Sequence, residues 1–117
     1  MINLQLSWVY SSDLERSHRF YSEILGLNLL RDEGSARIYS VNDGAAIGVC
    51  EAFEDRVVRP GGGMISLVTD EVDAWYQRLS QAGAKTLGEP HHLEKFGIYT
   101  FFTEDPDGYK IEFQQFT

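Results

Sequence analysis

Several residue types and segments are scarce in this chain of 117 residues, and each scarcity excludes a class of protein. Cys50 is the only cysteine, so an internal disulfide framework and a cysteine-cluster metal site are both excluded. No apolar run approaches the roughly 20 residues that cross a bilayer, and residues 1–4 lack the character of a signal peptide. We therefore expect a single soluble domain over residues 1–117, located in the reducing cytoplasm, with no membrane partner.

Positive charge is scarce as well. Ten Lys and Arg residues stand against 18 Asp and Glu residues, which gives a formal net charge of −8. Such a surface repels phosphate backbones, so we expect no nucleic-acid partner. The same charge would attract a cationic ligand, although the simpler interpretation is that it only keeps the protein soluble.

The first half of the chain has the pattern of one strand, one helix and three further strands. Residues 4–10 alternate in β-forming side chains, and Ser12 with Glu15 forms a capping box that predicts the start of a helix. Gly26 ends this helix, and three β-rich stretches follow at residues 27–31, 36–41 and 46–53.

The second half repeats this order. A strand is expected at 64–68, a helix begins near 70–73 and ends at Gly83, and strands are expected at 84–87, 97–103 and 109–116. Leu14 and Val72, at matching places in the two helices, differ by 58 in residue number, about half the chain. The repeat predicts an α+β fold of two βαβββ modules, at about 1–53 and 64–117, with a glycine-rich connector at about 54–63.

Two motifs then point to a family. They are Leu-Glu-Arg-Ser at 14–17, with Phe-Tyr at 20–21 and Leu-Gly-Leu at 25–27, and Asp-Pro-Asp-Gly-Tyr-Lys-Ile-Glu-Phe at 105–113. Together they resemble the vicinal-oxygen-chelate superfamily, which holds glyoxalases, bleomycin-resistance proteins and extradiol dioxygenases. The resemblance implies curled mixed sheets around a small-molecule cleft and, for a chain of this length, a homodimer.

The metal ligands of that superfamily can be traced onto this chain only in part. The resemblance places a ligating His at Leu6 in the first module and another at Met64 in the second. The ligating Glu of the last strand is present as Glu112, and a further acidic ligand would be Glu51 or Glu54. Leucine cannot ligate and a thioether suits copper(I) rather than the divalent ions of this family. We therefore expect no metal and no other cofactor.

The residues around these positions form the candidate ligand site. Alternation along the first strand puts Trp8 and Tyr10 on the face of Leu6, the face that the resemblance assigns to the cleft. Packing of both aromatic residues in a closed core is the alternative. On the last strand Lys110, Glu112 and Gln114 share a face by the same rule, with Ile111 and Phe113 toward the helix. The full expected set is Leu6, Trp8, Tyr10, Tyr39, Met64, Phe96, Tyr99 and Glu112.

Three histidines and the cysteine are expected to be structural. His18 lies on the apolar face of the first helix, His91 and His92 fall in an expected exposed loop, and Cys50 fits a buried strand position. The sequence shows no partner that would activate the Cys50 thiol, and contact with a ligand at the cleft rim is the alternative for His91 and His92.

Two functions follow from these patterns. The first is a binding protein that sequesters a planar aromatic compound, an antibiotic for example, with a cationic one favoured by Glu112 and the net charge. The second is a lyase, isomerase or dioxygenase-related enzyme with a degenerate metal site, in which Glu112 would be the catalytic base.

Overall fold

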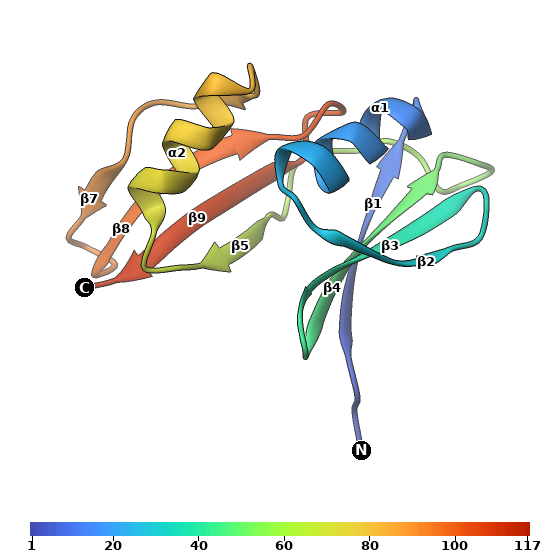
Figure 1. The fold of residues 1–117 in the computed structure, drawn as a ribbon, viewed down its shortest axis with the longest axis horizontal. Coiled ribbons are helices and arrows are strands. Elements are labelled where there is room, and N and C mark those ends of the chain that lie inside the picture. The colour runs from blue at the N-terminus through green and yellow to red at the C-terminus, as the bar shows by residue number, and fades with distance from the viewer. The chain divides into compact units, whose positions relative to one another are not determined.

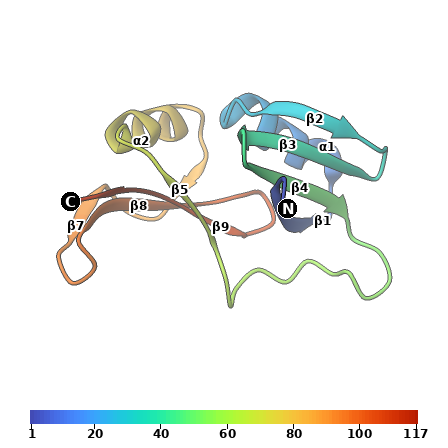
Figure 2. The same ribbon diagram turned by 90° about the horizontal axis from the view of Figure 1, so that it is seen from below.

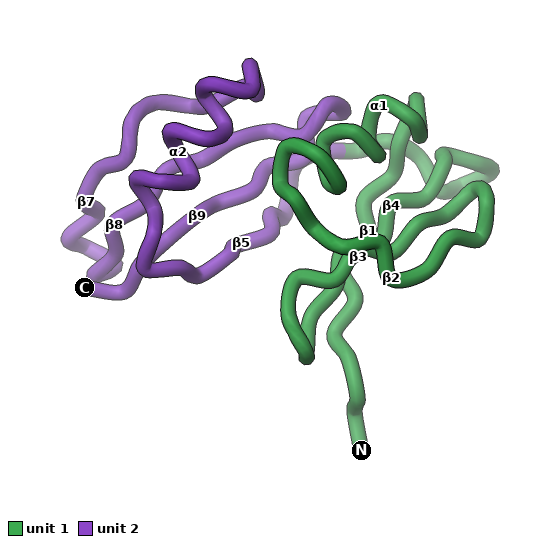
Figure 3. Tube along the Cα trace, viewed as in Figure 1, with its two compact units in different colours: residues 1–59 green, residues 60–117 purple.

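The computed structural model describes all residues from Met1 to Thr117, and the chain divides into two compact units (Figure 3). Unit 1 is Met1–Arg59 and unit 2 is Pro60–Thr117. The expected connector is shared between them, because residues 54–59 belong to unit 1 and 60–63 to unit 2.

Unit 1 is a four-stranded mixed sheet with one helical segment on it (Figure 1). Its strands follow the spatial order β1-β4-β3-β2, with β1 parallel to β4 and the other pairs antiparallel. The elements are β1 (Gln5–Ser11), α1 (Leu14–His18), η1 (Arg19–Ile24), β2 (Asn28–Asp32), β3 (Ala36–Asn42) and β4 (Ala45–Glu51).

Unit 2 repeats this arrangement in a five-stranded sheet with the order β5-β9-β8-β6, where β7 also pairs with β8. Again the first strand is parallel to the last, and again the strand before the last, here β8, pairs with it in antiparallel fashion. The elements are β5 (Ile65–Val68), α2 (Val72–Gln81), β6 (Lys85–Thr86), β7 (His91–Leu93), β8 (Ile98–Glu104) and β9 (Lys110–Phe116). The expectation of two βαβββ modules is thus confirmed, with β7 as an added strand.

The first helix begins one residue later than the capping box predicts. Asp13 is the N-cap, and its carboxylate accepts a hydrogen bond from the backbone amide of Arg16. Beyond His18 the helix widens into a π-helix, in which the amide of Leu25 donates to the carbonyl of Phe20 five residues earlier. The buried residues of α1 and η1 are Ser17, Phe20 and Tyr21.

Each unit has its core between the helix and one face of the sheet. In unit 2, Trp75 of α2 stacks on Phe113 with ring centroids 4.9 Å apart, and Phe113 stacks in turn on Phe101 at 5.3 Å. Figure 2 shows α2 lying along one side of β5, β8 and β9. Burying such a side chain stabilises the fold by roughly 1.5–3 kcal/mol. The core of unit 1 is built in the same way and includes Val9, Tyr21, Leu25, Tyr39, Ile47 and Val49.

The other face of each sheet carries no helix of its own unit, and we call it the open face. Neither unit contains a helix with the length and apolar character needed to cross a membrane.

Candidate functional site

The open face of unit 1 is apolar and has a flat centre. Strand register places Leu6 beside Ala46, Trp8 beside Gly48 and Tyr10 beside Cys50. Strand β3 adds its own residues on this face: Ala36, Ile38 and Ser40. Because the residues that β4 contributes are small, the large side chains of β1 can lie across the sheet.

Trp8 lies directly on Gly48. A Cβ atom built on Gly48 would be 2.6 Å from Cε3 and Cζ3 of the indole and 2.8 Å from Cδ2, whereas packed carbon atoms stay about 3.5–4.0 Å apart. Any side chain at position 48 would therefore displace the indole. Trp8 nevertheless remains 40% exposed, so the sheet supports one side of the ring and the other side is accessible.

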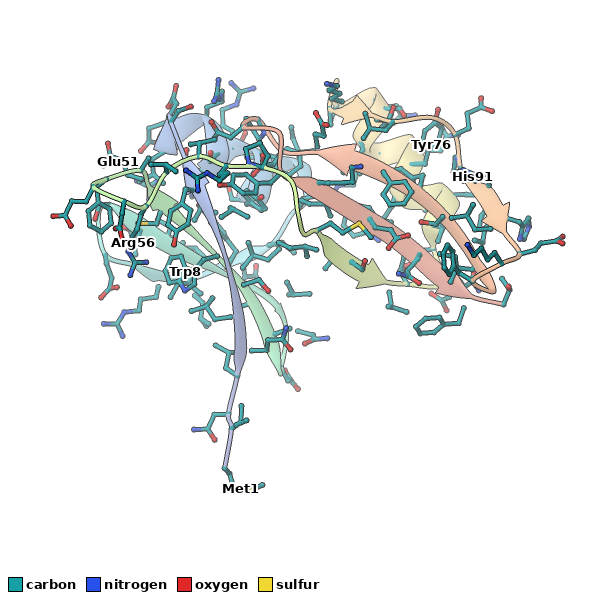
Figure 4. All side chains as sticks on the ribbon, turned by 180° about the vertical axis from the view of Figure 1, so that it is seen from behind. Met1, Trp8, Glu51, Arg56, Tyr76 and His91 are labelled. Carbon is teal, nitrogen blue, oxygen red and sulfur yellow. The ribbon has the colours of Figure 1, made fainter.

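A short turn after β4 brings a positive charge to this face. Phe53 and Arg56 close the turn with reciprocal backbone hydrogen bonds of 2.9 and 2.8 Å. Nη1 of Arg56 donates to the hydroxyl oxygen of Tyr10 at 3.2 Å, and its guanidinium lies 5.7 Å from the Phe53 ring centroid. Figure 4 views unit 1 from the side away from α1 and shows Trp8 and Arg56 close together there. Arg56 is a site residue that the sequence did not predict, because nothing in the connector's composition pairs it with a strand 46 residues earlier.

The open face of unit 2 is polar and centres on Glu112, which is only 3% exposed. Ser66 Oγ donates to Oε1 of this carboxylate at 2.6 Å, and Gln114 Nε2 donates to the same oxygen at 2.8 Å. Thr100 Oγ1 donates to Oε2 at 2.8 Å. The predicted face of Lys110, Glu112 and Gln114 is therefore present, and the carboxylate is held by three neutral donors.

Met64 lies at the edge of a hollow of about 590 Å³ in unit 2. Lys110 and Glu104 also line this hollow. Nζ of Lys110 lies 5.6 Å from the Phe102 ring centroid. Oε1 of Glu104 pairs with Lys85 Nζ at 3.0 Å. The remaining lining residues are Pro60, Gly61, Gly62, Gly63 and Gly108. Both charged side chains already have partners in unit 2.

The structural repeat identifies the position in unit 1 that corresponds to Glu112. Trp8 corresponds to Ser66 by the 58-residue offset; Trp8 pairs with Gly48, and Ser66 pairs with Glu112. Gly48 therefore occupies the place of Glu112 in unit 1. Glu51 lies an odd number of positions from Gly48 along β4, so its side chain is on the opposite face, while Glu54 sits in the following turn.

A divalent metal of the kind that the family resemblance implies does not fit this donor set. Leu6, Gly48 and Met64 supply no imidazole or carboxylate, and both oxygens of Glu112 already accept hydrogen bonds. No group of three or more His, Cys, Asp or Glu side chains is arranged to hold a metal ion.

Three expected site residues lie away from these two faces. Tyr39 pairs with Ile47 on the face under α1, is fully buried, and its hydroxyl is 2.7 Å from Nδ1 of His18. Burial raises the pKa of Tyr39, an effect that nearby Arg37 partly opposes. The expectation that Tyr39 faces the cleft is corrected, because the strand alternation that places Ile38 on the open face turns its neighbour toward the helix.

Tyr99 and Phe96 are likewise separate from Trp8 and Glu112. Tyr99 points to α2, where its hydroxyl donates to Oδ1 of Asp73 at 2.6 Å, and this hydrogen bond raises its pKa. This corrects its expected place on the cleft side. Phe96 is 66% exposed in the turn before β8, with Lys95 Nζ 5.5 Å from its ring centroid.

The histidines and the cysteine have structural surroundings. His18 is half-buried against Tyr39, as expected of a packed residue. His91 and His92 are exposed but belong to strand β7 rather than to a loop, and the His92 ring lies 4.7 Å from that of Tyr99. Cys50 is buried, and its thiol lies 3.3 Å from the Glu51 carbonyl oxygen.

Comparison with known proteins gives one family. The model of the Glyoxalase/Bleomycin resistance protein/Dioxygenase superfamily matches residues 5–113. A probable lactoylglutathione lyase of Synechocystis sp. is 31% identical over 118 residues, covering 88% of this chain and 87% of the relative. Lactoylglutathione lyase of Salmonella typhimurium is 32% identical over 114 residues, covering 86% and 82%.

Solved structures share the fold. Lactoylglutathione lyase from Agrobacterium tumefaciens superposes with a TM-score of 0.75 at 21% identity, covering 96% of this chain and 92% of that one. TioX from Micromonospora superposes with a TM-score of 0.78 at 18% identity, covering 97% and 98%.

Proposed function

Because the chain belongs to the Glyoxalase/Bleomycin resistance protein/Dioxygenase superfamily, we propose that it acts as a small-molecule binding protein. It holds a planar aromatic compound against Trp8 on the open face of unit 1, without a metal ion and without transforming the compound. The observation that carries this proposal is the indole of Trp8, which is supported by Gly48 on one side and accessible on the other.

The shape of this face selects flat ligands. Small side chains on β4 and the missing side chain at Gly48 let the indole lie close to the sheet, which leaves a broad ring surface rather than a narrow slot. Offset stacking on such a ring contributes about 0.5–1.5 kcal/mol beyond the burial of apolar area. Neighbouring Leu6 and Tyr10 extend the surface along the strand.

The lyase names of the relatives support an enzyme as the alternative, but the residues of this chain argue against it. Leu6 and Met64 stand where the resemblance places metal-binding histidines, and Gly48 stands where the repeat would place a second carboxylate. A base must also take a proton from its substrate, and Glu112 is buried with Ser66 and Thr100 donating to its two oxygens.

The test uses a panel of phenazines, quinones and bleomycin-type bithiazoles. Binding is followed by quenching of Trp8 fluorescence in a Trp75→Phe background, which removes the other tryptophan. Calorimetry then compares this protein with its Trp8→Ala derivative. Loss of stacking and of buried ring area should weaken binding by about one to three powers of ten.

Phe116→Ala is the matched control, because it removes a 70% exposed aromatic ring from unit 2 and should leave the affinity unchanged. The proposal is wrong if no compound in the panel quenches Trp8, or if Trp8→Ala binds every compound as well as the parent protein.

A further inference from the structure

The charge beside Trp8 is positive, although the whole chain is acidic. None of the residues that β1, β3 and β4 place on the open face of unit 1 is charged. Arg56 adjoins this face through Tyr10 and brings a positive charge to it. Arg31 lies on the edge strand in the same cross-strand row as Trp8, but its Nη2 already pairs with Oε2 of Glu33 at 2.9 Å. The local electrostatics therefore differ from those that the net charge of −8 suggests.

Arg56 is held in place by three separate features. The backbone bonds of the 53–56 turn fix its Cα, the Tyr10 hydroxyl accepts from Nη1, and the Phe53 ring lies under the guanidinium. Glu54 and Asp55 form the exposed tip of the same turn, but the polar contact of Arg56 is with Tyr10 rather than with these carboxylates.

A guanidinium has five N–H donors, and the bond to Tyr10 uses one of them. Its planar fork matches the geometry of a carboxylate, which can accept two parallel hydrogen bonds. Residues two apart in a strand are separated by about 7 Å. A bicyclic ligand stacked on Trp8 can therefore extend a substituent past Tyr10 to Arg56. Charges farther away than about 8–10 Å are screened at physiological salt. Arg56, the charged group next to a ring stacked on Trp8, therefore decides whether an anionic or a cationic ligand is favoured.

We propose that the open face of unit 1 recognises planar aromatic carboxylates, with the ring stacked on Trp8 and the carboxylate bound by Arg56. This inference rests on the proposed binding function and narrows its ligand class. It reverses the preference for cations that the net charge and Glu112 suggested, because Glu112 is enclosed by neutral donors in unit 2.

The experiment compares three probes with the same ring: 2-naphthoate, 2-naphthamide and 2-naphthylmethylammonium. Their affinities are measured by calorimetry on the full chain, on Arg56→Gln and on Arg19→Gln. The control removes the same charge from a residue of η1 whose guanidinium pairs with Glu23. We expect naphthoate to bind about tenfold more tightly than naphthamide, which is the effect of one charge-assisted hydrogen-bonded pair.

Arg56→Gln should remove this tenfold preference, so that naphthoate and naphthamide bind alike, whereas Arg19→Gln should preserve it. Arg56→Lys should keep part of the preference, because the charge remains while the bidentate geometry is lost.

The outcomes separate the two proposals. If the three probes bind equally, if the ammonium binds best, or if Arg56→Gln keeps the preference for naphthoate, the carboxylate assignment is overturned while the binding function stands. If none of the three perturbs Trp8 and the wider aromatic panel also fails, both proposals fall together.

Discussion

Replacing Gly48 by alanine should push the Trp8 indole off the sheet. The added Cβ would lie 2.6 Å from two indole carbons, so the ring must move outward by about 1 Å to reach normal packing distance. The backbone itself should accept the change, because Gly48 does not have the positive φ that glycine alone adopts readily.

Two opposing effects set the magnitude for stability. Overpacking costs about 1–3 kcal/mol in a closed core, but Trp8 is 40% exposed and can tilt into solvent, so the lower end of this range applies. Alanine also restricts the unfolded chain and returns about 0.4–1 kcal/mol. The net loss in the free energy of unfolding should be at most about 1 kcal/mol.

Binding and fluorescence should change more clearly than stability. In the Trp75→Phe background, Gly48→Ala should shift Trp8 emission to longer wavelength, increase acrylamide quenching, and weaken binding of a flat ligand about tenfold. Gly44→Ala is the control, since it adds the same methyl group in the turn before β4 where no atom lies within 4 Å. If both variants are equally stable and keep the parental emission and affinity, then Gly48 does not support the indole and the reasoning fails.

Two further predictions concern metal and assembly. After incubation with Ni²⁺, Zn²⁺ or Mn²⁺ and dialysis, elemental analysis should find far less than one ion per chain, because Leu6 and Met64 are not ligands for these ions; one tightly held ion would favour the enzyme instead. We also propose a homodimer, because each unit leaves one sheet face without a helix and a second copy can cover such a face while leaving a ligand cleft between the two copies. Sedimentation at micromolar concentration should then give about twice the 13.3 kDa of the chain, and a monomer would contradict this.

The sequence alone was sufficient for the architecture, because the signals for it are local and occur twice. Helix starts and stops and short alternating strands recur with the same offset, and the structure shows the same strand order in both units. The two-residue period of a strand also predicted correctly that Trp8 shares a face with Leu6. It likewise predicted that Glu112 and Phe113 point to different faces of the sheet.

Side-chain alternation gave wrong predictions where the sequence did not show which face of a strand points to the helix. Tyr39 and Tyr99 belong to strands whose sequences carry both apolar and polar residues on each face, so the pattern does not mark which face is outside. The pairing of Tyr39 with Ile47 shows which way its ring points. For Tyr99 the hydrogen bond to Asp73 of α2 shows it.

The character of the two open faces was decided by tertiary structure, because it depends on register between strands that are far apart in the chain. Local sequence placed Trp8 on the cleft face but left packing in a closed core open as the alternative. It is the pairing of Trp8 with Gly48, 40 residues later, that leaves one side of the indole on bare backbone and the other side free. In the same way, the donors of Ser66 and Thr100 reach Glu112 only through strand pairing, and they turn a candidate base into an enclosed carboxylate. Sequence periodicity thus determined which side of its own strand each of these residues occupies. Strand register, set by the packing of whole sheets, determined what each of them touches.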